Sequence, residues 1–112
     1  MFITLWLDDA RDPADNRWAD LVQRPDNSIL VWVKSFEEFV WWIEANGLPD
    51  HICFDHDINS DIFNGVDAAK YLTGYCLSKD LPLPSYSIQS ANTIGRENIK
   101  SVLESFKRSK RI

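Results

Sequence analysis

Acidic residues follow two apolar segments of this chain, at the points where those segments end. Residues 2–7 run directly into Asp8 and Asp9, and residues 52–54 run directly into Asp55. If both segments are parallel strands of one sheet, their carboxyl ends share an edge. Crowded carboxylates repel one another unless a cation or shared protons compensate, and Mg²⁺ prefers oxygen ligands of this kind. The pattern therefore predicts that Asp8, Asp9 and Asp55 bind Mg²⁺ or Mn²⁺ at this edge.

Neutral polar residues follow a third apolar segment, residues 86–88, and lead into the last predicted helix. Ser90 and Asn92 lie in this connection, and Arg96 falls in the first turn of the helix. The unbonded N–H groups of a helix N-terminus favour anions, and a cation there opposes the helix dipole. Arg96 is therefore expected to have an anionic partner, either the aspartates or a bound phosphate, unless it is simply an exposed surface arginine.

His56 and Asp57 follow Asp55 directly, so the apolar segment 52–54 leads into the run Asp55, His56 and Asp57. A histidine at this place suits proton transfer near neutral pH, or it holds the loop by hydrogen bonds. Asp55, His56 and Asp57 are the candidate catalytic residues. The other histidine, His51, precedes its strand and is expected at the opposite edge of the sheet.

The arrangement of apolar segments indicates the fold that would bring these residues together. Apolar strand-like segments alternate with amphipathic helix-like segments, which predicts a parallel sheet with right-handed crossovers. We expect a three-layer α/β sandwich with strands in the order 2-1-3-4. The predicted strands are residues 2–7, 28–33, 52–54 and 86–88, and the helices include Trp18 to Val22, Ser35 to Asn46, Val66 to Cys76 and the segment from Ile99 to Phe106.

Composition restricts the class of protein. At 112 residues the chain is expected to be one domain, and its net charge of −5 argues against binding duplex DNA. The apolar run at the N-terminus is too short for a signal peptide or a membrane span. Cys53 and Cys76 lie at apolar positions without a metal-binding spacing, so both are expected in the core of a cytoplasmic protein.

Two adjacent tryptophans, Trp41 and Trp42, lie beside the apolar stripe of their helix. They either pack under a neighbouring loop or form a patch that binds a protein partner.

Taken together, these motifs resemble receiver domains, and more closely one divergent branch, the cyclic-phosphate processing receiver-like family of bacteria and their phages. The resemblance covers nearly the whole chain. It implies a receiver or flavodoxin-like fold, in which Asp8, Asp9 and Asp55 hold Mg²⁺. It further implies that Ser90 contacts a phosphoryl group. It also implies that Arg11 and Gln89 join Ser90, Asn92 and Arg96 in binding the ligand. The residues that carry it are Leu5 to Pro13, Phe54 to Asp57, Ser90 to Asn92, Gly95 and Asn98.

Two departures from these families stand out. Receivers keep a lysine at the end of a fifth strand, whereas we expect no lysine after an apolar strand of this chain. In the divergent branch a histidine usually precedes the serine, and this chain has Gln89 in that place. A glutamine cannot exchange a proton near neutral pH.

Three functions remain open on the sequence. The first is a metal-dependent phosphoesterase that acts on cyclic phosphates of nucleotides or RNA ends, with His56 moving a proton. The second is a receiver that accepts phosphate on Asp55. The third is a non-catalytic protein that sequesters a phosphorylated ligand or docks a partner through its tryptophans. The missing lysine counts against the second, and Gln89 favours the third over the first.

Overall fold

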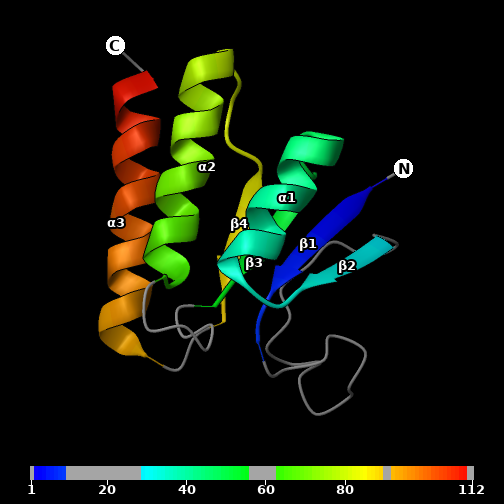
Figure 1. The fold of residues 1–112 in the computed structure, drawn as a ribbon. Coiled ribbons are helices and arrows are strands. Elements are labelled where there is room, and N and C mark those ends of the chain that lie inside the picture. The colour runs from blue at the N-terminus through cyan, green and yellow to red at the C-terminus, as the bar shows by residue number, and fades with distance from the viewer. Residues whose placement is uncertain (1, 10–28, 56–62, 90–91, 111–112) are drawn as a thin grey trace.

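Four parallel strands form one sheet in the order β2-β1-β3-β4, as predicted (Figure 1). The structure is a computed structural model that describes residues 2–9, 29–55, 63–89 and 92–110. The strands are β1 (Ile3–Leu7), β2 (Ile29–Val33), β3 (His51–Phe54) and β4 (Ser85–Ile88). Their parallel direction places all four carboxyl ends at one edge of the sheet.

Three helices cover one face of this sheet, namely α1 (Phe36–Asn46), α2 (Gly65–Lys79) and α3 (Thr93–Lys110) (Figure 1). Alternate strand residues point toward them, because successive side chains of a strand lie on opposite faces. These residues are fully or almost fully buried against Phe39, Leu72 and Leu103 of the helices. The sheet side of this core consists of Leu5, Leu7, Val33, Ile52 and Phe54.

The α/β fold class is confirmed, and the described helices supply one of the two helical layers that we expected. The short helix predicted between Trp18 and Val22 lies outside the described residues. Within the described part of the chain, no helix has the length and apolar character needed to cross a membrane.

The sheet face opposite these helices carries polar side chains between its apolar ones. The ring nitrogens of His51 lie 2.7 Å from the Ser85 hydroxyl and 3.3 Å from the Ser87 hydroxyl. His51 is the first residue of β3, so its predicted position far from the carboxyl edge is confirmed. Cys53 on this face and Cys76 on α2 are both buried, as predicted.

The start and end of α1 follow from two local signals. Ser35 caps the helix, since its hydroxyl accepts a hydrogen bond from the backbone N–H of Glu38 at 3.1 Å. Gly47 ends it with φ 84° and ψ −171°, and its N–H donates to the carbonyl of Ile43. A backbone of this kind is almost restricted to glycine.

Gly47→Ala is expected to destabilise the protein by about 1–3 kcal/mol, because alanine is strained at this φ and ψ. Apart from the glycine and its two neighbours in the chain, no described atom lies within 4 Å of the added Cβ, so the cost is conformational and not steric. Gly74→Ala is the matched control, because this α2 residue also leaves an added Cβ without close contacts. It should stabilise by up to about 1 kcal/mol, as alanine favours a helix interior. Urea unfolding measures the free energy of unfolding of both variants, which should be lower than that of wild type for Gly47→Ala and higher for Gly74→Ala. Equal changes in the two variants would contradict this prediction.

Candidate metal centre

Three carboxylates converge where β1 and β3 end. Asp8 and Asp9 follow β1 directly, and Asp55 follows β3 directly. Each residue offers one oxygen, and these oxygens all lie within 4.8 Å of one another. Asp8 is 1% exposed and Asp55 is 7% exposed, whereas Asp9 is half-buried. The predicted acidic cluster is therefore formed at the predicted edge.

The neighbouring strand β2 holds the backbone of Asp8 from two sides. The N–H of Asp8 donates to the carbonyl of Val33 at 3.1 Å, which extends the β1–β2 ladder by one residue. The carbonyl of Asp8 accepts a hydrogen bond of 2.7 Å from the indole N–H of Trp32. Because both backbone groups are engaged, the chain direction at the first carboxylate is fixed by β2.

Gln89 links the far side of the site to β1. Its backbone N–H donates to the carbonyl of Phe54 at 2.9 Å, and this bond extends the β3–β4 ladder. Its side-chain Nε2 donates to the carbonyl of Leu7 at 3.2 Å, a contact between residues 82 positions apart. The buried amide thus reaches from the end of β4 to the peptide that precedes Asp8.

This donor set fits a hard divalent cation. Three carboxylates whose oxygens lie this close repel one another in the absence of a compensating charge, and two of them are almost fully withdrawn from water. Mg²⁺ and Mn²⁺ bind to carboxylate oxygens and complete their shells with water or phosphate oxygens. The residues present are therefore suitable ligands for the predicted ion.

The start of α3 lies at the same edge, following β4. The side-chain oxygen of Asn92 accepts a hydrogen bond from the N–H of Gly95 at 2.9 Å, and its carbonyl accepts from the N–H of Arg96. Asn92 is thus the helix cap, in addition to the ligand-binding role predicted for it. Arg96 lies in the first turn, as predicted, with an exposed side chain.

The remaining predicted site residues lie outside the described part of the chain. They are Arg11, His56, Asp57 and Ser90. Their roles stay predictions.

The two adjacent tryptophans of α1 have different environments. Trp42 is partly buried and packs against the core. Trp41 is 67% exposed. The partner-binding patch therefore stays a prediction for Trp41, while Trp42 has a packing role.

Sequence reasoning missed Lys34 and Trp32. The expectation that no lysine follows an apolar strand was wrong, because Lys34 comes directly after Val33, the last residue of β2. Its ammonium lies 4.3 Å from the centroid of the Trp32 ring, the same ring whose N–H contacts Asp8. The sequence contained this information. The aspartates were identified because they follow apolar strands directly, and Lys34 follows β2 in the same way.

Comparisons with known proteins support the assignment of fold and family. The family described as "Cyclic-phosphate processing Receiver domain" matches residues 3–105. A solved structure titled as a yeast Spc42 trimeric coiled coil fused to another structure aligns with a TM-score of 0.52 at 14% identity. That alignment covers 98% of this chain and 84% of the other, and it concerns the fold alone. No curated protein sequence matches significantly.

Proposed function

The chain belongs to the cyclic-phosphate processing receiver domain family, and from this we propose that it binds the cyclic phosphate of a nucleotide or an RNA end with a divalent metal ion and hydrolyses it. The observation that carries the proposal is the convergence of Asp8, Asp9 and Asp55 at the carboxyl edge of the sheet. In open parallel sheets, ligands bind at this edge.

Hydrolysis of a cyclic phosphate consumes one water molecule. The water oxygen forms a new bond to phosphorus, one of the two ring ester P–O bonds breaks, and the leaving oxygen takes up a proton. The products are a phosphomonoester and a hydroxyl group. A group that takes a proton from water and returns it to the leaving oxygen would promote both halves of this exchange.

Each residue of the proposed site has a distinct task. Asp8, Asp9 and Asp55 hold Mg²⁺ or Mn²⁺, which when bound supplies positive charge to the phosphate oxygens. His56, which Asp57 follows in the sequence, moves the proton. The phosphate-binding residues are Arg11, Gln89, Ser90, Asn92 and Arg96.

Non-catalytic binding of the same ligand is the second candidate, and Gln89 is the observation that favours it. Its buried side-chain amide donates a hydrogen bond to the carbonyl of Leu7. An amide can orient a phosphate by donating a hydrogen bond, but it cannot act as an acid or a base at neutral pH. A protein with this residue could therefore retain the ligand without turning it over.

A panel of 2′,3′- and 3′,5′-cyclic nucleotides, each with Mg²⁺ or with EDTA, tests both candidates. Metal-dependent formation of a phosphomonoester, measured by chromatography, is the result that the first candidate predicts. Saturable metal-dependent binding without product, measured by calorimetry, is the result expected of the second. If no cyclic nucleotide binds or reacts, and an oligoribonucleotide that ends in a 2′,3′-cyclic phosphate neither binds nor reacts, both candidates are wrong.

Asp9→Asn and Asp80→Asn form a matched pair for this panel. Both remove one carboxylate charge, but Asp80 caps the C-terminus of α2 with a left-handed backbone that asparagine also adopts. Metal-dependent binding should fall at least about tenfold in Asp9→Asn, since one charged ligand is lost. It should be unchanged in Asp80→Asn.

A further inference from the structure

Lys34 and Trp32 form a second feature at the acidic edge, on the side away from α3. We propose that the ammonium of Lys34, placed by the indole of Trp32, is an anion-binding group that contacts a phosphate-bearing ligand bound at Asp8, Asp9 and Asp55. This inference rests on the proposed function for the location of the ligand. It adds a contact on β2, where the sequence-based site had none.

Strand register places Lys34 level with the acidic residues. Trp32 pairs with Trp6, and Trp6 pairs with Cys53, so one row of side chains crosses β2, β1 and β3 on one face. Two positions further along each strand, the same alternation gives Lys34, Asp8 and Asp55. Adjacent strands lie about 4.8 Å apart, so a lysine in this row starts one strand away from the first carboxylate.

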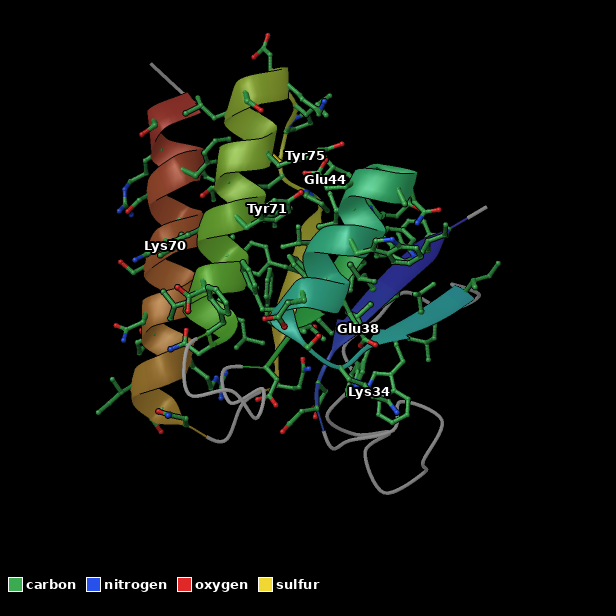
Figure 2. All side chains as sticks on the ribbon, viewed as in Figure 1. Lys34, Glu38, Glu44, Lys70, Tyr71 and Tyr75 are labelled. Atoms are coloured by element: carbon green, nitrogen blue, oxygen red, sulfur yellow. The ribbon has the colours of Figure 1, made fainter. Side chains whose placement is uncertain are left out.

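Contacts made by Trp32 connect Lys34 to the site. The indole N–H is bonded to the carbonyl of Asp8 at 2.7 Å, and the Lys34 ammonium lies over the same ring at 4.3 Å from its centroid. A cation over an indole is attracted to its electron-rich face, so this position is preferred over free rotation in water. Figure 2 shows Lys34 at the edge where β1 and β2 end, near the first turn of α1.

The backbone of Lys34 is fixed as well. Its N–H donates to the carboxylate of Glu38, in the first turn of α1, at 2.5 Å. Among the described residues, the ammonium itself makes no ion pair, and the side chain is exposed. Lys34 therefore keeps a solvent-accessible positive charge one strand away from Asp8, without an ion pair to any described carboxylate.

This arrangement is suited to an anion more than to the metal alone. A positive charge near the site opposes the binding of a bare divalent cation and favours an anion that accompanies it. Phosphate oxygens accept charge-assisted hydrogen bonds from ammonium groups. Lys34 should therefore have effects of opposite sign on the two ligands, which a lysine remote from the site would not have.

Lys34→Met tests this directly with two probes, Mg²⁺ alone and inorganic phosphate at saturating Mg²⁺, each followed by calorimetry. The affinity for Mg²⁺ alone should rise several-fold, because an opposing charge is removed. The affinity for phosphate should fall by roughly 10- to 100-fold, the usual effect of losing a hydrogen bond to a charged group. Lys34→Arg, which keeps the charge, should restore phosphate affinity to within a few-fold of wild type.

Lys79→Met is the matched control, since Lys79 also lies over an aromatic ring, that of Tyr75, but at the end of α2. It should change neither affinity. Trp32→Phe removes the N–H bonded to Asp8 and should weaken phosphate binding less than Lys34→Met does.

The outcomes separate this inference from the proposed function. If Lys34→Met behaves like Lys79→Met while wild type binds both probes, the role of Lys34 is overturned and the proposed function stands. If inorganic phosphate binds and depends on Lys34, but cyclic nucleotides do not bind, the role of Lys34 stands and the proposed function is wrong. If phosphate and cyclic nucleotides both fail to bind, both are wrong.

Discussion

Gln89→His is expected to raise phosphoesterase activity by about 10²- to 10⁴-fold, the usual contribution of a positioned acid–base group. Gln89 stands where the family usually has a histidine, and its amide donates to the carbonyl of Leu7. One N–H of an imidazole can make the same hydrogen bond. This bond would fix the tautomer and leave the second nitrogen to exchange a proton. The substitution thus adds proton transfer while it keeps the link between β4 and β1.

Hydrolysis of 2′,3′-cyclic nucleotides in Mg²⁺ measures this gain, with kcat and KM determined separately. The effect should be on kcat, because both residues can orient the ligand but only the histidine exchanges protons. Gln89→Asn keeps an amide and is the control that should show no gain. A wild-type protein that already turns over briskly, with Gln89→His neutral, would contradict the role given to this position. His56 would then be the residue that transfers the proton, and His56→Ala should lower kcat strongly.

The acidic cluster could be predicted from the sequence because it depends on which residues directly follow the buried strands. Asp8 and Asp55 follow buried strands directly, so parallel pairing is enough to bring them together. The positions of the strands and the capping of α1 by Ser35 were accessible for the same reason, since apolar period and cap chemistry are visible in short segments.

Contacts between distant segments were not accessible in that way. The amide of Gln89 reaches the carbonyl of Leu7 across 82 positions, and no local pattern indicates which carbonyl a buried amide will select. The indole of Trp32 and the carbonyl of Asp8 meet only because β2 pairs with β1 in this register. Trp41 and Trp42 are neighbours on one helix, and only the packed structure shows that the second is partly buried while the first is exposed.

The crowding of the three carboxylates has a direct consequence for stability. Without a cation, the negative charges of Asp8, Asp9 and Asp55 repel one another, because one oxygen of each carboxylate lies within 4.8 Å of the others. Asp55→Asn is therefore expected to stabilise the metal-free protein, by about 1 kcal/mol for charges at this separation in a partly hydrated site. A substitution that stabilises the metal-free protein and abolishes metal binding is characteristic of a ligand in an anionic cluster.

Mg²⁺ should stabilise wild type and have little effect on the variant. At 100 times the dissociation constant, a ligand that binds only the folded state stabilises it by about 2.7 kcal/mol. For a chain of this length that free energy corresponds to a shift in Tm of roughly 10 °C. Asp55→Asn should lose most of this shift, because one of three charged ligands is gone. Thermal unfolding followed by circular dichroism, with Mg²⁺, with Mn²⁺ and with EDTA, measures all of these quantities.

Asp80→Asn separates the site from general charge effects, since it removes the same charge at the C-terminal end of α2. Its metal-free Tm should stay near that of wild type, and its Mg²⁺-dependent shift should be retained in full. A shift that is equal in wild type, Asp55→Asn and Asp80→Asn would mean that Mg²⁺ acts by screening the net charge of −5 and not by binding at the cluster. If neither metal ion changes the Tm of wild type, and Asp55→Asn changes nothing, the cluster is not a metal site.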